Sequence, residues 1–259
     1  MTVSDDTLKA RRLASHFEHL ERVGRASDGA RSVDLPGGVR AAITPVRPDR
    51  SVVNGVAYSD TDALIAALDE LARVYEEAGI DAWTVWVPTE DRRAAAALSA
   101  AGHALDGVPR DMGASLDEMD LEARFELDLE PEPSWVDVAE INESAYYASQ
   151  GGSYFGPALA RLDERPYLAR VDGRPAACLA IADIDDDAYV QLVATRPDFQ
   201  RRGLAGELLR LALREARDRG MRTTTLEGTA AGAPVYTRVG YRDLGELQMW
   251  ERRVRNDSA

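Results

Sequence analysis

The sequence is poor in cysteine, with Cys178 as the only one among 259 residues. A single cysteine excludes any disulfide within the chain and is typical of proteins in a reducing compartment. Long apolar runs are missing as well, both near the start, where a signal peptide would need one, and elsewhere, where a membrane span needs about 20 apolar residues. We therefore expect a cytoplasmic protein without a membrane partner.

Positive charge is also scarce. Lysine and arginine number 31 against 45 aspartate and glutamate residues, a formal net charge of −14 at pH 7. So acidic a chain is poorly suited to phosphate backbones, and we expect no nucleic-acid partner. The acidic field would attract cationic small molecules, although it can equally serve solubility alone. His16, His19 and His103 show no metal-ligand spacing, so we expect no metal site.

Hydrophobic residues at 45% and charged residues at 29% are ordinary for a globular protein, and the length allows one large domain or two small ones. The hydrophobic periodicity predicts helices that alternate with strands, which indicates an α/β fold. Helices are predicted near 7–23, 62–78, 92–101, 134–147, 157–162, 204–219 and 233–239. Strands are predicted near 39–44, 51–57, 82–87, 121–129, 167–171, 176–182, 188–195, 223–227 and 247–253. Residues 27–38 predict a loop, and Asp172-Gly173 predicts a hairpin turn.

The most informative stretch is residues 193–220. A β-rich segment ends at Thr195, a short basic turn follows, and the turn opens directly into an amphipathic helix. The first amides of a helix lack intrahelical partners and the helix dipole adds partial positive charge, so a helix start attracts anions. Gly203 leaves room for phosphate oxygens near the backbone, and Arg201 and Arg202 add charge. The stretch therefore predicts a pyrophosphate site.

The two halves of the chain repeat one plan. Each ends in a long helix, a glycine, a strand, a short helix, and a second glycine followed by a residue with a ring. The corresponding positions are Gly79, 83–87 and Gly102-His103 in the first half, and Gly220, 223–227 and Gly240-Tyr241 in the second. We expect two lobes, residues 1–120 and 121–259, each a mixed, mostly antiparallel twisted sheet flanked by helices. The alternative is a single domain with an unrelated N-terminal extension.

Three motifs occur in order in the second half: a Val-x-Thr-x-Pro strand end, Gln200-Arg201-Arg202-Gly203-Leu204-Ala205, and Pro234-Val235-Tyr236-Thr237-Arg238-Val239-Gly240-Tyr241. Together with the order of elements over residues 122–253, they resemble the GNAT superfamily of N-acetyltransferases, whose acetyl-CoA motif is Gln/Arg-x-x-Gly-x-Gly/Ala. The resemblance implies an acyltransferase that moves an acetyl group from acetyl-CoA, its cosubstrate, to a primary amine of a small molecule or peptide by direct transfer.

The resemblance also implies which residues bind acetyl-CoA. In the family, the strand before the turn pairs its backbone with the pantetheine arm, and the amides of the turn hold the pyrophosphate. These roles fall on Val193, Ala194 and Thr195, and on Gln200, Arg201, Arg202, Gly203, Leu204, Ala205 and Gly206. The loop 228–233 lacks the asparagine that often contacts the cofactor in the family, so that contact has no counterpart here.

Two residues are candidates for catalysis. Tyr236 aligns with the tyrosine that commonly protonates the departing thiolate, which would make it the general acid; the alternative is a packing or thiol-orienting role. Amine acetylation also needs a neutral amine, and therefore a base. Glu227 sits on the strand beside the expected thioester and is the candidate base. The alternative for Glu227 is a solvated or structural carboxylate.

Acceptor-binding candidates lie between the first two helices of the second half, the region that covers the acceptor site in this family. They are Glu143, Tyr146, Tyr147 and the loop 149–155 with Tyr154. Aromatic rings beside a glutamate would suit a cationic amine. Each of these residues could instead belong to the core or to plain surface.

The same alignment applied to the first half places carboxylates where the second half has its anion site. If Gly79 matches Gly220, Asp62 takes the position of Gly203 and Asp60 that of Arg201. Carboxylates favour the empty helix start but would repel pyrophosphate, so the first half predicts a degenerate lobe that packs on its twin. Two rival functions stay open: a CoA-binding or sensing protein without turnover, and acyl transfer to a hydroxyl.

Overall fold

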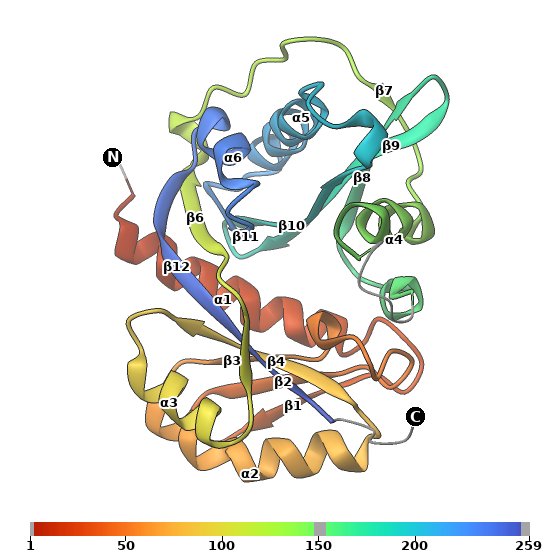
Figure 1. The fold of residues 1–259 in the computed structure, drawn as a ribbon. Helices are drawn as coiled ribbons and strands as arrows, with labels where there is room; N and C mark the ends of the chain where they lie inside the picture. Colours follow the sequence, from red (N-terminus) through yellow and green to blue (C-terminus); the bar gives the residue numbers. More distant parts are fainter. Residues whose placement is uncertain (1–2, 148–153, 255–259) are drawn as a thin grey trace. The chain divides into compact units, whose positions relative to one another are not determined.

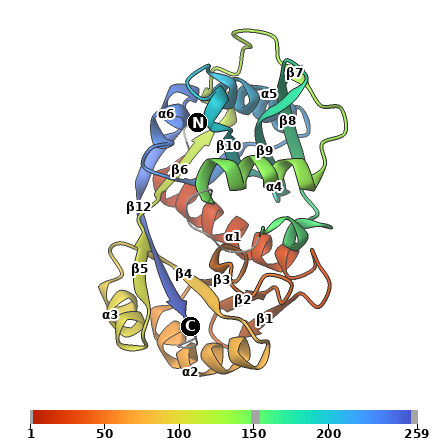
Figure 2. The ribbon, with the colours of Figure 1, turned by 45° about the vertical axis from the view of Figure 1, so that its right-hand side comes forward.

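The computed structural model describes residues 3–147 and 154–254, and the chain divides into two compact units (Figure 1, Figure 2). Unit 1 comprises Met1–Ser15, Arg110–Gly156 and Asp163–Gly245; unit 2 comprises His16–Pro109, Pro157–Leu162 and Glu246–Ala259. Helix α1 (Asp5–Val23) and strand β12 (Arg242–Arg253) begin in unit 1 and end in unit 2. Each unit thus draws on several segments, whereas the predicted lobes 1–120 and 121–259 are contiguous. That the two lobes are relatives stays a prediction.

Unit 1 is built on a mixed, mostly antiparallel sheet. Its strands are β6 (Arg110–Ser115), β7 (Asp128–Leu129), β8 (Arg165–Val171), β9 (Arg174–Ile184), β10 (Asp187–Thr195), β11 (Thr223–Gly228) and the first residues of β12. Their order is β12-β6-β11-β10-β9-β8-β7. Strands β10 and β11 pair in parallel, because helix α5 (Leu204–Asp218) carries the chain back between them. The pairs β6–β11, β9–β10, β8–β9 and β7–β8 are antiparallel.

The helices of unit 1 cover both faces of this sheet. They are α1 up to Ser15, α4 (Trp135–Asn142), α5 and α6 (Ala233–Val239), and α4 continues as the π-helical turn η3 (Glu143–Tyr147). The short 3-10 turns are η2 (Leu116–Glu118), η4 (Gly156–Leu159) and η5 (Pro197–Phe199). The last residues of η4 belong to unit 2. Neighbouring residues of a strand point to opposite faces. Leu179 of β9 packs with α5, and Cys178 beside it packs with α4. Helices α4 and α5 therefore lie on opposite faces.

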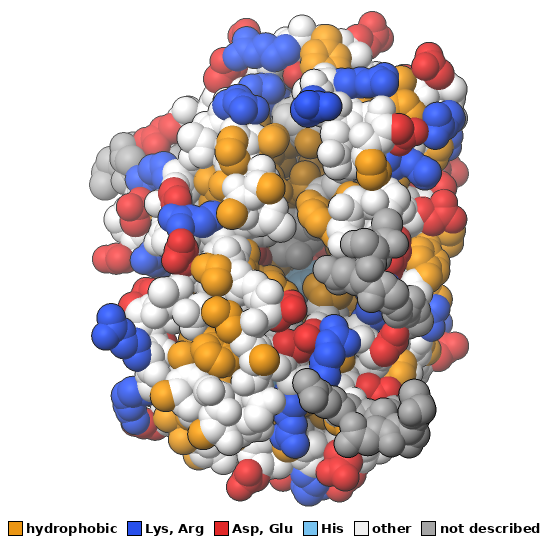
Figure 3. All heavy atoms as spheres, in the orientation of Figure 1, with side chains coloured by type: hydrophobic (Ala, Val, Ile, Leu, Met, Phe, Trp, Pro, Cys, Tyr) orange, Lys and Arg blue, Asp and Glu red, His pale blue; other side chains and the backbone are white. Residues whose placement is uncertain are grey.

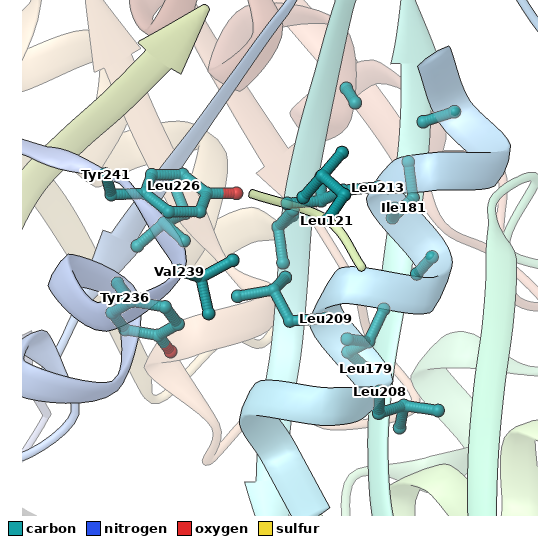
Figure 4. Close-up of a cluster of buried hydrophobic side chains, with 14 of the residues drawn as sticks. Leu121, Leu179, Ile181, Leu208, Leu209, Leu213, Leu226, Tyr236, Val239 and Tyr241 are labelled. Atoms are coloured by element: carbon teal, nitrogen blue, oxygen red, sulfur yellow. The ribbon is translucent and has the colours of Figure 1, made fainter. Parts of the chain in front are cut away.

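The core of unit 1 gathers where α5 and α6 meet the sheet (Figure 4). The leucines of α5 point toward Leu179 and Ile181 of β9 and toward α6, which contributes Tyr236 and Val239. The predicted four-residue spacing on α5 is confirmed, because its members are all buried: Leu204, Leu208, Ala212 and Ala216. Burying a leucine stabilises the fold by about 2 kcal/mol, so this face fixes α5 on the sheet and with it the turn that precedes the helix.

Unit 2 contains a second mixed sheet. Its strands are β1 (Arg31–Leu35), β2 (Val39–Ile43), β3 (Gly55–Tyr58), β4 (Ala82–Pro88), the last residues of β12, and β5 (Ala104–Gly107), which pairs with β12. Its helices are α2 (Thr61–Glu77), α3 (Arg92–Ala100) and the 3-10 turn η1 (Ser51–Val53), besides the end of α1. Strands β3 and β4 are parallel and joined by α2, the same plan as β10-α5-β11 in unit 1. The glycine that follows each crossover helix, Gly79 or Gly220, has a positive φ.

Several predicted elements are wrong. Residues 51–53, predicted as strand, form the 3-10 turn η1, and strands β5 and β6 were not predicted. Residues 31–35, read as loop, form β1, whose polar residues sit on a half-exposed edge strand and so hide the strand pattern. The predicted strand 121–129 is reduced to Asp128–Leu129. The residues before it lie along α5 instead, where Glu207 accepts a hydrogen bond from the amide of Arg124. The hairpin at Asp172-Gly173 is confirmed, and both residues have positive φ. None of the helices in the described part of the chain has the length and apolar character needed to cross a membrane.

Candidate active site

Strands β10 and β11 separate at one end of unit 1. They pair only over 187–189 and 223–225, yet β10 runs on to Thr195 and β11 to Gly228. Their outer edges stay paired with β9 and β6. Beyond the last shared pair, the backbone groups on the two facing edges are therefore not bonded across the gap. Figure 3 shows unit 1 hollowed between α6 and α4, with hydrophobic side chains in the hollow and Lys or Arg side chains along its upper rim.

A bulge reshapes β10 within this open stretch. The pairing with β9 shifts register between Gln191 and Ala194, and Leu192 takes a left-handed backbone with φ 55°. Such a conformation costs a leucine about 1–2 kcal/mol, so its surroundings must hold it. The amide of the buried Asn142 donates to the Leu192 carbonyl at 3.0 Å, and the Cys178 thiol lies 3.5 Å from the same oxygen. Burial raises the pKa of Cys178, so the thiol stays neutral and can donate.

The bulge sets the three residues that the resemblance assigns to the pantetheine arm. The hydroxyl of Tyr146, on the π-helical turn η3, donates to the Val193 carbonyl at 2.7 Å. The side chain of Gln200 donates to the Thr195 carbonyl at 3.2 Å, while Ala194 between them is buried. The carbonyls on both sides of Ala194 thus already accept hydrogen bonds from side chains of unit 1.

The turn before α5 has the backbone of an anion site. Arg201 has φ 62° and Gly203 has φ 80°, the left-handed conformation that glycine adopts without strain. Gly203 is the N-cap of α5 and offers no side-chain cap, so the first-turn amides are left for another acceptor. Arg202 is anchored beside them, with its guanidinium over the Phe199 ring at 5.2 Å and a hydrogen bond to the Asp198 carbonyl at 3.2 Å. The arrangement suits a doubly charged anion such as pyrophosphate.

Glu207 is a residue that sequence reasoning missed. Helical spacing places it on the polar face of α5, but its side chain is buried. One carboxylate oxygen accepts from the Arg124 amide at 2.8 Å, and the other lies 3.6 Å from the guanidinium of Arg210. Glu207 therefore ties the segment before β7 to the first turn of the same helix. No local sequence signal could show this, since the partner lies far away in the chain.

Tyr236 lies at the same open end, on α6. Its ring packs on Gly228, where an added Cβ would come within 2.5 Å of the ring, so that position must stay glycine. The Tyr236 side chain is buried, and burial raises the pKa of its hydroxyl, which therefore stays protonated and able to donate. The hydroxyl of Tyr146 is the other group that influences this pKa. Both phenols thus belong to the open end of the sheet.

Glu227 carries a buried carboxylate at the end of β11. It lies directly opposite Asp111 in the β6–β11 register. The Tyr189 hydroxyl donates to Glu227 at 2.6 Å, and the guanidinium of Arg12 lies 3.7 Å from its other oxygen. Arg12 also donates to Asp111 at 3.2 Å. The side chain of Glu227 is 4% exposed, so a structural carboxylate fits this site better than a solvated one, and its role as base stays a prediction.

The acceptor-binding candidates are placed less uniformly. Tyr146 reaches β10 as described. Glu143 accepts from the Phe155 amide at 3.1 Å, and the Tyr154 hydroxyl donates to the Val136 carbonyl of α4 at 2.8 Å, so both shape the local loop. The side chain of Tyr147 and residues 149–153 of the predicted loop lie outside the described residues. In the part of the chain that is described, no three His, Cys or carboxylate side chains are arranged to hold a metal ion.

The helix start of α2 in unit 2 binds the chain's own carboxylates. Asp60 caps α2 and accepts from the Ala63 amide at 2.8 Å. Asp91 accepts from Thr61 at 2.6 Å and from the Tyr58 hydroxyl at 2.7 Å. Carboxylates at these positions would repel a phosphate group. They support the prediction that this half does not bind acetyl-CoA.

Comparison with known proteins agrees with this geometry. The family model described as the acetyltransferase (GNAT) family matches residues 126–241. A GCN5-related N-acetyltransferase from Kribbella flavida superposes with a TM-score of 0.69 at 19% identity, covering 96% of this chain and 97% of that one. A GCN5-related N-acetyltransferase from Sphaerobacter thermophilus superposes with a TM-score of 0.59 at 18% identity, covering 98% of this chain and 95% of that one. A conserved protein of unknown function from Staphylococcus epidermidis superposes with a TM-score of 0.63 at 15% identity, covering 87% of this chain and 94% of that one.

These identities show a shared fold and no more, and a search of curated proteins found no match. The mixed, mostly antiparallel sheet flanked by helices, predicted from the sequence, is confirmed. The family match covers the bulged strand, the turn, α5 and α6, which are the elements that build the open end of unit 1. Residues 126–241 therefore form a domain of the acetyltransferase (GNAT) family, which implies acyl transfer from acyl-CoA.

Proposed function

We propose that this chain transfers an acetyl group from acetyl-CoA to a primary amine of a small molecule or peptide, directly and within unit 1. One observation carries the proposal: strands β10 and β11 separate beside an uncapped helix start, with a buried tyrosine hydroxyl at the same end. An extended ligand with an anionic end fits that combination.

The residues present fit acetyl-CoA as cosubstrate. The amides of residues 201–206, with Arg201 and Arg202, would hold the pyrophosphate. The edge Val193–Thr195 would pair with the pantetheine arm. When bound, acetyl-CoA supplies the acyl group as a thioester, and the apolar hollow beside α6 keeps water away from it. Because residues 228–233 contain no asparagine, the contact often made by that side chain is absent from the proposal.

Two side chains would move the protons. The amine nitrogen forms a bond to the acyl carbon while the carbon–sulfur bond breaks. Glu227 takes the proton that the amine loses, directly or through one water, and Tyr236 donates its proton to the departing sulfur. Burial raises the pKa of Tyr236, which weakens it as an acid. The same desolvation raises the pKa of the departing thiol, so the difference between the two pKa values, and with it the free energy of the proton transfer, changes little.

The acceptor enters this proposal through Tyr146. Its hydroxyl is bonded to the bulge of β10, and the residue is 41% exposed, so its ring can also meet a ligand. An aromatic face attracts an ammonium group by about 0.5–1 kcal/mol at an exposed site. The net charge of −14 favours the approach of cationic molecules in the same sense.

The test is release of free thiol from acetyl-CoA with a panel of polyamines, aminoglycosides, amino acids and peptides. One class of amine should turn over, and mass spectrometry should find one added acetyl group on that amine. The same classes carrying hydroxyls in place of amines should give no product. If no amine supports turnover while acetyl-CoA still binds, the chain is a binding protein and the proposal is wrong. If only the hydroxyl compounds are acetylated, the proposal is also wrong, and the chain is an O-acetyltransferase.

A further inference from the structure

The beginning of α1 brings a guanidinium to the carboxylate that we assign as base. Arg12 belongs to unit 1 and its side chain is 7% exposed. It contacts Asp111 at 3.2 Å and Glu227 at 3.7 Å. We propose that Arg12 is a positioning residue for Glu227, which it keeps ionised and correctly directed beside Asp111 so that Glu227 can accept the proton of the acceptor amine. This inference rests on the proposed function.

The strand register explains why a cation is needed here. Asp111 on β6 and Glu227 on β11 are direct cross-strand partners, so their side chains lie on the same face, roughly 5 Å apart at Cβ. Two buried carboxylates at that separation repel each other, and one of them would take up a proton unless a cation lies between them. Arginine suits this place because its planar fork can serve two carboxylates and stays charged. Burial lowers the pKa of Arg12, but the attraction of Asp111 and then Glu227 outweighs it and leaves the pKa raised.

Other titratable groups face the same carboxylate. Tyr189 of β10 donates to it, and burial, followed by the charge of Glu227, raises the pKa of this phenol, so it remains a donor. Glu164, just before β8, acts on Tyr189 electrostatically. Asp187, two residues earlier on β10, has a pKa raised by burial and accepts from Ser15, Thr223 and Thr225. The neighbouring Arg11 forms an ion pair with Asp186 at 2.8 Å. Arg12 contributes a positive charge 3.7 Å from the carboxylate of Glu227.

The position of Glu227 joins this cluster to the proposed reaction. Glu227 lies two residues beyond Thr225, the last residue of β11 that pairs with β10. Leu226 packs with α5, so the side chain of the next residue, Glu227, lies on the opposite face of the sheet, where Arg12 of α1 contacts it. The ring of Tyr236 packs against the next residue, Gly228, on the other face of the strand. The proposed base and the proposed acid therefore stand on opposite faces of the same strand end.

The source of the cation makes the inference specific to this chain. Arg12 and Asp111 both lie outside residues 126–241, the segment that the family model matches. The family segment supplies Glu227, whereas α1 and β6 supply the two charges that set its protonation. Changing those two charges should shift the pKa of Glu227 in opposite directions.

The sign of each shift follows from electrostatics. Arg12→Met removes the positive neighbour, which raises the pKa of Glu227. Asp111→Asn removes the negative neighbour and leaves Arg12 to Glu227 alone, which lowers that pKa. A charge at this distance moves a carboxyl pKa by about 1–3 units, so we expect a shift of about one unit in each direction. Arg12→Lys keeps the charge and should shift the pKa less than Arg12→Met.

The first measurement needs no acceptor. Protein labelled with ¹³C at the glutamate carboxyl is titrated by NMR, and the Glu227 signal is identified by its loss in Glu227→Gln. Opposed shifts in Arg12→Met and Asp111→Asn support the inference; no shift, or shifts of the same sign, overturn it. Arg12→Met leaves two buried carboxylates without their cation and is open to unfolding. In that case the double variant Arg12→Met/Asp111→Asn carries the test, because it buries one carboxylate without its cation instead of two. Its Glu227 pKa should lie above that of Asp111→Asn, and an equal pKa overturns the inference.

The second measurement ties the cluster to catalysis. Thiol release from acetyl-CoA is followed against pH with the best amine of the panel. A base acts only above its pKa, so the acid limb of kcat/KM should move to higher pH in Arg12→Met and to lower pH in Asp111→Asn. His16→Gln, one helical turn after Arg12, controls for histidine titration and should leave these opposed shifts in place. If the NMR pKa moves but the limb does not, Glu227 is not the base, and that part of the proposed function fails while the charge cluster stands.

Discussion

The hydrogen bond from Tyr146 to the Val193 carbonyl gives the sharpest prediction for cosubstrate binding. If Val193 pairs with the pantetheine arm, the ligand and the Tyr146 hydroxyl compete for one backbone edge. Tyr146→Phe keeps the ring and removes the hydroxyl that donates to the Val193 carbonyl. The variant should therefore bind acetyl-CoA more tightly than the wild type, the reverse of what is expected when a ligand contact is deleted.

The structure sets the size of the effect. The bond is 2.7 Å long and ends on a carbonyl next to the left-handed Leu192, which other groups hold in place, so its loss should not collapse the bulge. A hydrogen bond of this kind contributes about 1 kcal/mol net, which corresponds to about fivefold in Kd. Isothermal titration of each variant with acetyl-CoA measures the change. Tyr154→Phe is the matched control, because its hydroxyl bonds the Val136 carbonyl on α4, and its Kd should match that of the wild type.

Weaker binding by Tyr146→Phe would show that the hydroxyl assists the ligand rather than competing with it. An unchanged Kd would show that the Val193 carbonyl takes no part in binding. Either result refutes the competition, and a change of equal size in Tyr154→Phe would assign the effect to the loop rather than to β10.

Variants at three further positions test the remaining parts of the site. Acetyl-CoA should raise the Tm of the wild type and of Gly203→Asn, which tolerates φ 80°, but not of Gly203→Glu, whose charge repels pyrophosphate; an equal rise in Gly203→Glu would disprove the anion site. Tyr236→Phe should lower kcat by about 10²–10⁴-fold with little change in the Kd for acetyl-CoA, and unchanged turnover would remove Tyr236 as the acid. Asn142→Ala leaves the Leu192 carbonyl short of its donor, so urea unfolding should show a loss of about 1–3 kcal/mol; a loss within error would mean that β9 alone holds the bulge.

The sequence was a good guide where structure depends on near neighbours in the chain. The four-residue spacing on α5, the start of that helix at Leu204 and the turn at Asp172-Gly173 are local patterns, and each forms as predicted. The β1 strand was missed because a half-exposed edge strand carries no apolar alternation. Local patterns therefore located the helix start but not the edge of the sheet.

Features that depend on distant residues could not be predicted. Nothing near Leu192 signals a bulge, because the residue that stabilises its backbone is Asn142, on a helix earlier in the chain. The polar face of α5 includes Glu207 by periodicity, yet the Arg124 amide draws it into the interior. Glu227 could be named as a candidate from its strand position, but its charge environment could not, since Arg12 and Asp111 are themselves 99 residues apart.

The charge cluster also bears on how one fold can serve many acceptors. In the proposed site, the turn, α5 and β10 would contact, through backbone groups, the parts of the ligand common to every acyl-CoA, so side-chain changes there would gain little. The protonation of the proposed base, Glu227, would depend instead on side chains, and two of them, Arg12 and Asp111, come from α1 and β6. A substitution at Arg12 or Asp111 can therefore retune the base for an amine of different basicity without disturbing the cosubstrate site. If that reasoning holds, Asp111→Asn should change the pH at which the amine reacts and leave the Kd for acetyl-CoA unchanged.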